Sequence, residues 1–479
     1  MKRGFTLIEL LAVIVILAII ALIATPIVLD IIEDSKESAN IQSINSLVDM
    51  AEMYATTNET TGNLYNKVID KIEGSKPDNG VVYVNKKGEV ALALKYNNKC
   101  YIKAYDSNKI TQSKDENCIV PIDYLMVVDT TNGETQKVFN SEITKSQVEK
   151  IITVSTNEVP VDVIGSFDVS ENQNRSIMAW YKDEDNNGLY ELYIGQDGGV
   201  KANPNSYKLF NYYTNVVSMD LNNLDTSNVT NMGALFQRCE KLLNLDLSGF
   251  NTTNVTTMRS MFTNCYDLQN INLSSFDTSK ITTMRAMFQN CSSLLYLDVS
   301  NFNTSNVTDM RSMFYALKVN SIDVSNFDTS NVTTMSGMFA MCTNLKTLNL
   351  SNFNTSKVTT MEGMMNYCES LKDINLSSFD TSNVTTMKGM FTACKSLEKI
   401  DLSNFDTSNV VNMEGMFRFT QILKTININK ADFTKVTEYT NMFGESGVTN
   451  ITVKDATAKT FIESRLTDAS ITGVTVTIG

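Results

Sequence analysis

Residues 327–335 read Phe-Asp-Thr-Ser-Asn-Val-Thr-Thr-Met, and versions of this stretch return throughout the second half of the chain. The copies start every 26 residues, with a single interval of 25 beside Leu317. Nine copies are visible, at Asp225, Asn251, Asp277, Asn303, Asp328, Asn354, Asp380, Asp406 and Asp432. A period of this length predicts a solenoid, in which each unit buries its apolar face against its neighbours.

Two periods alternate within one repeat. A spacing of 3, 3, 1, 3 and 3 residues predicts one apolar face of a short helix, formed in one copy by Ile281, Met284, Met287, Phe288, Cys291 and Leu294. Leu297-Asp298-Val299 then alternates inward and outward, as a short strand does. A strand and a helical segment in 26 residues predict an α/β leucine-rich-repeat solenoid over 225–453, with a C-terminal cap at 454–479 made of a helix and a final strand.

The N-terminus predicts a membrane segment. Met1-Lys2-Arg3-Gly4 and Phe5-Thr6-Leu7-Ile8-Glu9 precede an uncharged apolar run from Leu10 to Leu29. A helix of that length spans about 30 Å, the thickness of a hydrocarbon core. The basic residues place the short side in the cytoplasm, so the remainder is exported. The run is too long for a secretory signal, and no A-x-A-like site follows it. Glu9 is costly in such a helix and is therefore expected to be functional.

The stretch from Gly4 to Glu9 resembles the processing motif of type IV prepilins and pseudopilins. The resemblance implies a leader of residues 1–4, cleavage after Gly4 by a prepilin peptidase, and methylation of Phe5. It also implies that Glu9 docks the subunit among other pilin subunits, and that Pro26 loosens the helix, as a proline does in many pilins. The helix is expected to continue as an amphipathic segment, giving a pilin helix over 5–57.

Residues 81–105 predict a three-stranded antiparallel sheet with turns at Lys87-Gly88 and Asn97-Asn98. Together with the long helix, this small domain (58–120) makes an α+β pilin-like module. Cys100 and Cys118 are the two cysteines outside the repeats, and export favours a disulfide between them. Residues 121–150 are polar without a clear period and are interpreted as a linker. Residues 151–224 are interpreted as an N-terminal cap of the repeat domain.

The chain from about residue 150 onward resembles the BspA-like leucine-rich-repeat surface proteins. Phe327 to Met335 is characteristic of them, and the stretches 177–180, 192–194 and 198–203 look like their non-repeat lead-in. The resemblance implies adhesion or host interaction in broad terms. A host protein or glycan is the expected class of ligand, and no particular ligand carries over.

Composition argues against several functions. The net charge of −13 disfavours nucleic acid as a direct partner. The chain has no histidine and no CxxC pair, so neither an enzyme nor a cofactor or metal site is expected. Asp183-x-Asp185-x-Asn187-Gly188 resembles the start of a calcium loop, but Ile194 stands where the bidentate glutamate belongs, which favours a hairpin turn. The repeat cysteines are interpreted as buried core residues, with disulfides between neighbouring copies as the alternative.

The outward strand positions are all Asp or Asn: Asp246, Asn272, Asp298, Asp323, Asn349, Asn375, Asp401 and Asn427. This row is either a solvated face or a ligand surface, since solenoids expose a continuous sheet. We predict ligand binding by Asp246, Asp298, Asp323 and Asp401. The charges on the helical side vary from copy to copy, as Arg259, Arg285, Arg311, Lys388 and Glu414 show, which suits solubility.

The sequence as a whole therefore predicts a bacterial type IV pilin-like protein, minor or at the filament tip, that presents an extracellular adhesin domain. Its precursor is expected in the cytoplasmic membrane and its mature form on the cell surface. The alternative is a pseudopilin of a secretion or DNA-uptake machine.

Overall fold

The computed structural model describes residues 7–58, 60, 62–72, 74–85, 87–105, 107–113, 118, 125–128, 133, 135–139, 141–171 and 173–479. Within 7–58 it describes the side chains of residues 11–18, 28 and 32–58. The chain forms two compact units, one of residues 1–124 with 172–176 and one of residues 125–171 with 177–479. Strands far outnumber helices in the described parts, and each unit has its own core.

The first unit combines one long helix with a small antiparallel sheet. Its elements are α1 (Leu7–Asn58), β1 (Gly62–Asn63), α2 (Tyr65–Val68), η1 (Ile69–Lys71), β2 (Asn79–Val84), β3 (Val90–Tyr96), β4 (Lys99–Lys103) and β5 (Thr111–Ser113). The strands pair antiparallel in the order β1-β2-β3-β4-β5. β2, β3 and β4 are the three strands expected from the sequence, and α1 ends one residue beyond the expected Thr57.

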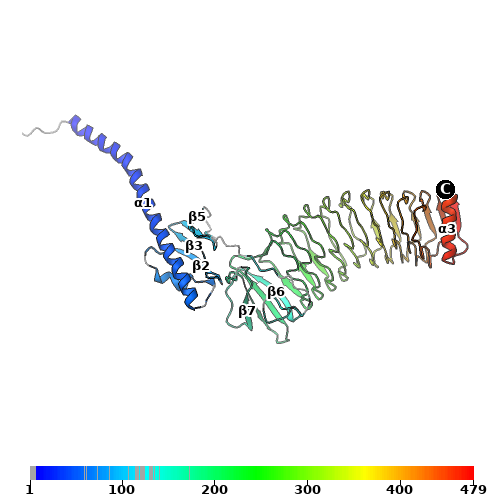
Figure 1. Cartoon of the computed structure of the whole chain (residues 1–479), viewed down its shortest axis with the longest axis horizontal. Coiled ribbons are helices and arrows are strands. Elements are labelled where there is room, and N and C mark those ends of the chain that lie inside the picture. The colour runs from blue at the N-terminus through cyan, green and yellow to red at the C-terminus, as the bar shows by residue number, and fades with distance from the viewer. Residues whose placement is uncertain are drawn as a thin grey trace, which may run out of the picture. The chain divides into compact units, whose positions relative to one another are not determined.

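The C-terminal part of α1 covers one face of this sheet (Figure 1). Ile44, Leu47 and Ala51 are fully buried at helical spacing and share a core with Val82 and Leu92. Alternate strand residues face the helix, so one apolar helix stripe meets one sheet face. Burying each of the larger aliphatic side chains stabilises the unit by about 1.5–3 kcal/mol.

A tight turn joins β3 to β4. Asn97 and Asn98 have φ of 48° and 65°, the left-handed values that a two-residue hairpin turn needs at both central positions. Asparagine tolerates this conformation better than most residues do. Asp78 holds the turn, because its carboxylate accepts a hydrogen bond from the Asn97 N–H at 2.7 Å.

The second unit begins with a mixed sheet that continues into the repeats. Its first elements are η2 (Lys145–Gln147), β6 (Val148–Val154), β7 (Gly165–Asp168), β8 (Met178–Lys182), β9 (Tyr190–Gly195), β10 (Val200–Lys201), β11 (Ser218–Asp220), β12 (Leu224–Asp225), β13 (Asn244–Asp246) and β14 (Asn270–Asn272). Seven strands pair in the order β14-β13-β11-β6-β9-β8-β7. Because β6, β11, β13 and β14 run parallel, the strand side of the repeats extends the lead-in sheet.

The prediction of a linker over 121–150 is wrong for the described part of that segment. Met126, Val138 and Ile143 are buried in the core of the second unit. The N–H of Val138 donates to the carbonyl of Ile143 at 2.9 Å, which closes a short hairpin just before η2. The buried residues are scattered over irregular backbone, so neither a helical nor a strand period was readable.

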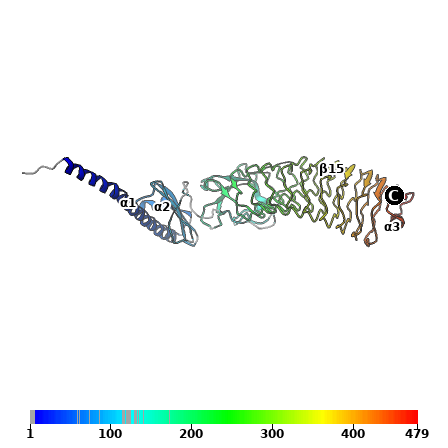
Figure 2. The same ribbon diagram turned by 90° about the horizontal axis from the view of Figure 1, so that it is seen from above.

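The repeats form a stack of coils, one coil per copy, as Figures 1 and 2 show. Equivalent residues of neighbouring coils pair in parallel, such as Asn244 with Asn270 and Thr257 with Thr283. One ladder uses short strands, continued by β15 (Thr347–Asn349), β16 (Asp373–Asn375), β17 (Lys399–Asp401), β18 (Thr425–Ile428) and β19 (Asn450–Val453). A second ladder of single bridges runs from Asn205 to Glu438.

Stacked side chains fill the interior of the coils. The rings of five successive coils stack with centroids 5.4–6.1 Å apart, formed by Phe236, Phe262, Phe288, Phe314 and Phe339. The methionines of the Met-x-x-Met stripe are buried beside them, as Met284 and Met287 show. Each side chain thus packs on its own equivalents in the neighbouring coils, which explains why the apolar positions repeat.

The prediction of a short helix in each repeat is wrong, because the described coils form turns at those residues. In the copy at 281–294, Ala286 and Asn290 have φ of 55° and 61°, which a right-handed helix does not contain. Alternate N–H groups bond to the next coil, as Phe288 does to the carbonyl of Met313 at 2.9 Å. The other N–H groups close turns within the coil: that of Met287 donates to the carbonyl of Met284 at 3.1 Å. The repeats are therefore β coils, and the α/β part of the prediction does not hold.

The C-terminal cap has the two elements expected within 454–479, α3 (Ala456–Asp468) and β20 (Thr475–Ile478). Ala458, Ile462 and Leu466 form a buried stripe on α3 at a spacing of four residues. Asp455 caps the helix by accepting a hydrogen bond from the Ala458 N–H at 2.9 Å. β20 pairs parallel with β19.

Candidate functional site

The predicted processing residues lie mostly beyond what the structure describes. Gly4 and Phe5 are outside the described residues, and Glu9 and Pro26 lie within α1 with their side chains outside them. In the described part of the chain, no helix combines the length and apolar character needed to cross a membrane. The membrane-spanning segment at Leu10–Leu29 therefore stays a prediction.

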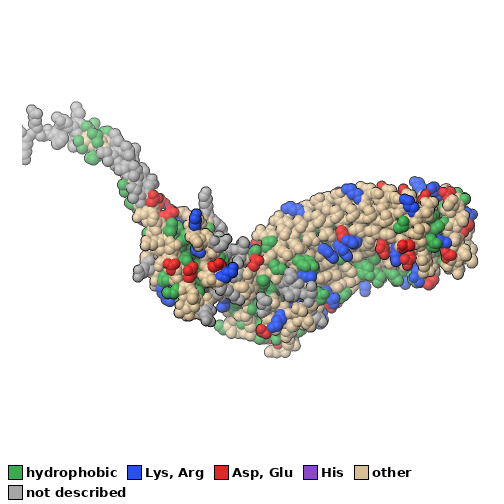
Figure 3. All heavy atoms as spheres, in the orientation of Figure 1, with side chains coloured by type: hydrophobic (Ala, Val, Ile, Leu, Met, Phe, Trp, Pro, Cys, Tyr) green, Lys and Arg blue, Asp and Glu red, His purple; other side chains and the backbone are tan. Residues whose placement is uncertain are grey.

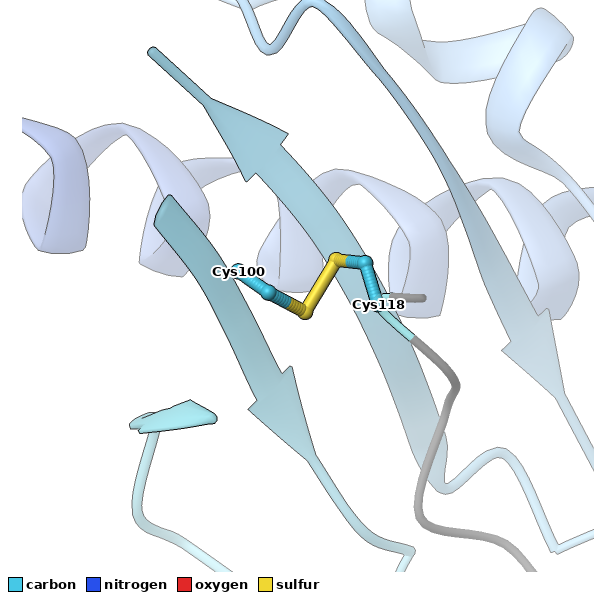
Figure 4. The surroundings of a disulfide bond; sticks show 2 residues. All are labelled: Cys100 and Cys118. Carbon is cyan, nitrogen blue, oxygen red and sulfur yellow. A yellow bond between two sulfur atoms is a disulfide. The ribbon is translucent and has the colours of Figure 1, made fainter. Parts of the chain in front are cut away.

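Cys100 and Cys118 form the predicted disulfide, with their Cα atoms 5.2 Å apart (Figure 4). Cys100 lies on β4, and Cys118 packs with Tyr83 and Ile102. These two residues alternate along their strands with those that face α1, so the bond lies on the other face of the sheet. A cross-link closing a loop of this size contributes about 3 kcal/mol to stability.

The repeated Asp-Thr-Ser-Asn motif holds neighbouring coils together. In the copy starting at Asp380, the carboxylate accepts a hydrogen bond from the Ser382 N–H at 3.0 Å. The buried Thr381 donates through Oγ1 to the carbonyl 25 residues later at 2.8 Å. Asn383 donates through Nδ2 to the carbonyl 27 residues earlier at 2.8 Å. All three polar residues are used within or between coils, which gives the motif a structural reason to recur.

The four aspartates predicted to bind ligand are exposed on the strand side of the coils. Each carboxylate also accepts a hydrogen bond from the backbone N–H two residues later; the distances are 3.0, 2.9, 2.9 and 3.0 Å for Asp246, Asp298, Asp323 and Asp401. The equivalent asparagines form the same turn. This turn needs an oxygen on a short side chain, and Asp and Asn form it more strongly than Ser or Thr. The uniformity of the row thus has a structural origin that the sequence reasoning missed.

These turns also determine the charge of the row. The serine two residues later, through its N–H and its hydroxyl, keeps the pKa of Asp246, Asp298 and Asp323 below the ordinary aspartate value. Hydrogen bonds to a carboxylate favour its charged form. The strand side therefore carries negative charge throughout the physiological range.

Strand pairing is interrupted midway along the stack. It runs from β11 to β14, resumes with β15 and β16, and after a further break continues from β17. Residues 296–298 and 321–323, which are all described, belong to no strand. The interruption coincides with the 25-residue copy around Leu317.

An exposed apolar pair and a groove lie at this interruption. Leu295 and Tyr296 are 70% and 74% exposed. On the following coils, a groove of about 450 Å³ is lined by residues 321–323, 347–349 and 373–375, which include Asp323. Exposed large apolar side chains beside a polar groove are typical of binding surfaces. We call Leu295, Tyr296 and these groove residues the strand-face site.

The sequence reasoning missed the apolar pair because it followed only the Asp/Asn row. The available signal was Tyr296 itself, which occupies an outward position where other copies carry Asn, Ser, Thr, Asp or Lys. Of the four predicted aspartates, Asp323 lines the groove, and Asp246, Asp298 and Asp401 lie outside its lining.

Charges on the turn side of the coils pair with one another. Arg311 contacts Asp309 at 2.6 Å, and Lys388 contacts Glu414 at 2.8 Å. The Lys388–Glu414 pair is exposed, and such a pair contributes little to stability. Figure 3 shows that the visible face of the coils is covered mainly by backbone and uncharged polar side chains, with charges scattered among them.

Among the described residues, no cluster of three or more His, Cys, Asp or Glu could hold a metal ion. Asp183–Gly188 forms the turn between β8 and β9, in which Asp183 accepts from the N–H groups of Asn187 and Gly188 at 3.0 and 3.1 Å. The six repeat cysteines are free and buried. Burial raises the pKa of Cys265 to about 12, which keeps its thiol protonated and unreactive.

Two family models match the chain. The one described as "Prokaryotic N-terminal methylation motif" matches residues 1–25. The one described as "Mycoplasma protein of unknown function, DUF285" matches residues 205–320, 294–375 and 342–456. No curated protein matches the chain. Among solved structures, a leucine-rich-repeat protein of Leptospira interrogans matches at 13% identity with a TM-score of 0.22, over 60% of this chain and 78% of that one.

The family matches confirm both resemblances in a single chain, the methylation segment of type IV pilins and the repeats of the surface-protein family. The three repeat matches overlap and together cover residues 205–456, which is more than half of the 479 residues. The chain therefore belongs to the family described as "Mycoplasma protein of unknown function, DUF285", and it joins that family's repeats to an N-terminal methylation motif.

Proposed function

We propose that this protein is a type IV pilin-like surface protein whose coil stack binds ligands outside the cell. The observation that carries the proposal is the presence, in one chain, of the methylation motif over 1–25 and the repeat family over 205–456. The motif implies processing by a prepilin peptidase and assembly with pilin subunits. The cut falls after Gly4, Phe5 is methylated, and Glu9 docks the subunit.

The size of the second unit supports a minor or tip position. That unit comprises residues 125–171 and 177–479, and the motif belongs to the much smaller first unit. Packing so large an addition around every subunit of a filament would crowd its surface, whereas a few subunits or one tip subunit accommodate it. Before assembly, the apolar run Leu10–Leu29 holds the precursor in the cytoplasmic membrane.

The strand-face site is the proposed binding surface, and a host protein or glycan is the proposed ligand. The exposed ring of Tyr296 offers an apolar body with a polar tip, which suits contact with a sugar ring or a protein side chain. The groove next to it offers hydroxyl, amide and carboxylate groups for hydrogen bonds. The negative charge of the aspartate row disfavours acidic ligands.

The test compares full-length wild-type protein with variants on an array of glycans and extracellular-matrix proteins. Leu295→Ser combined with Tyr296→Ser should weaken binding at least tenfold, because losing two central apolar contacts costs about 2 kcal/mol or more. Val411→Ser is the matched control, since Val411 is 41% exposed on the ladder of single bridges, away from the site. Unchanged binding by the double variant, or no binding by the wild type, would refute the proposed surface.

The charge of the groove has its own variant. Asp323→Asn removes the carboxylate, and asparagine forms the same turn at equivalent positions, so the fold is preserved. Weaker binding by this variant would assign the charge a role in the ligand contact.

The alternative, a pseudopilin of a secretion or DNA-uptake machine, shares the methylation motif and needs a cellular test. Surface filaments sheared from cells should contain the processed protein if it is a pilin subunit. Its absence from sheared filaments, with recovery only in an envelope complex, would favour the alternative.

A further inference from the structure

A buried lysine in the second unit is hydrogen-bonded to a buried asparagine. Lys145 is the first residue of η2, Asn211 lies in the segment before β11, and both are 0% exposed. Lys145 Nζ donates to Asn211 Oδ1 at 3.0 Å. Lysine is almost never fully buried in proteins, so the position calls for a specific reason.

The surroundings of the amine are closed to solvent. Lys145 Nζ lies 5.4 Å from the ring centroid of Tyr213, and both Tyr213 and Phe210 are fully buried. Burial keeps out water, which would compete with the amine for the carbonyl carbon.

The backbone holds both partners in place. The N–H of Lys145 donates to the carbonyl of Gln136 at 2.9 Å, and the N–H of Asn211 donates to the carbonyl of Lys208 at 3.0 Å. The preceding residue, Phe210, is also fixed, because its N–H donates to the carbonyl of Leu235 in the next coil at 2.9 Å. The two side chains therefore meet through segments that are each fixed by the fold.

We propose that Lys145 and Asn211 form an intramolecular isopeptide bond. Oδ1 is bonded to Cγ at about 1.2 Å, so Nζ lies within roughly 4 Å of the carbon that it attacks. This is close to the separation of about 3–3.5 Å from which such attacks proceed. The neutral amine adds to Cγ, an Nζ–Cγ amide bond forms and the Cγ–Nδ2 bond breaks. One amine proton moves to the departing nitrogen, which leaves as ammonia, and no redox partner is needed.

The bond would fasten the start of the lead-in sheet to the coils. The two residues are 66 positions apart, and β6 to β10 lie between them. Tension applied from the N-terminal side to the coil stack would then pass through the covalent link. Without it, the same tension would load the strand-to-strand hydrogen bonds of the lead-in sheet.

Mass spectrometry of the full-length wild-type protein tests the proposal. The linked protein is lighter than its sequence by one ammonia, and trypsin releases residues 138–150 joined to residues 209–238 as one branched peptide. Peptide mapping separates this loss from ammonia lost at Asn-Gly sites such as Asn187-Gly188. A free peptide ending at Lys145, with no branched peptide, overturns the proposal.

Two variants assign the chemistry. Lys145→Met should abolish the branched peptide. Asn211→Asp should keep the link by losing water in place of ammonia, so the two mature proteins have the same mass although their sequences differ. The wild-type peptide map decides the question even where a variant fails to fold.

Discussion

Replacing Thr355 with valine should weaken the junction between two neighbouring coils. Thr355 is fully buried, and its hydroxyl makes two hydrogen bonds to the backbone of Asp380 in the next coil. Oγ1 donates to the Asp380 carbonyl at 2.7 Å and accepts from the Asp380 N–H at 2.9 Å. Valine has nearly the same shape and makes neither bond, so it isolates the role of the hydroxyl.

The expected cost is about 2–4 kcal/mol in the free energy of unfolding. Each lost hydrogen bond accounts for about 1 kcal/mol, and each backbone group left unpaired adds a desolvation penalty. Coils contact only their neighbours, so the damage should remain local to this junction. Urea unfolding followed by circular dichroism measures the cost, and hydrogen exchange at the Asp380 amide reports its location.

Thr359→Val is the matched control in the same coil. Thr359 is exposed, and its hydroxyl makes a single bond of 3.2 Å to the Thr333 carbonyl, which water can replace. That variant should unfold within about 0.5 kcal/mol of the wild type. Equal effects of the two substitutions, or an Asp380 amide that stays protected in Thr355→Val, would refute the assignment of stability to this hydroxyl.

Three further predictions concern the rest of the chain. Intact mass should show loss of residues 1–4 and one added methyl group, and Gly4→Ala should leave unprocessed precursor; a native chain that begins at Met1 contradicts this. Cys100→Ser should lower the free energy of unfolding of the first unit by about 3 kcal/mol, measured by urea unfolding against the wild type with and without reductant. Hydrogen bonds from Ser279 hold the pKa of the Asp277 carboxylate below the ordinary aspartate value in the folded protein. The stability that this carboxylate contributes is therefore present above the ordinary pKa and is lost as pH falls through the lower folded pKa. Asp277→Asn should therefore reduce the loss of stability between neutral and strongly acidic pH, and an unchanged loss would count against this role.

The sequence by itself determined the features that depend on period and local chemistry. The 26-residue repeat identified the stacked units, and the inward positions it predicted, such as Met284 and Phe288, are the buried ones. The strands of the first unit, its Asn97-Asn98 turn and the C-terminal cap were readable for the same reason, because alternation, turn residues and capping act within a few residues.

Tertiary structure alone decided where backbone groups find partners. The spacing around Phe288 fits a helix and a pair of turns equally well, and the choice depends on a carbonyl in the next coil, that of Met313. Likewise, the sequence of 125–150 has no clear period, so only the folded structure shows which of its residues are buried in the core of the second unit.

The candidate site was predicted in part. Its side of the coils and Asp323 were predicted, whereas Leu295 and Tyr296 were not, because the prediction followed only the Asp/Asn row. The meeting of Lys145 with Asn211 was equally unreadable, since no local pattern connects side chains 66 residues apart. Sequence patterns report the period of a chain, and only the folded backbone brings distant polar groups to one place.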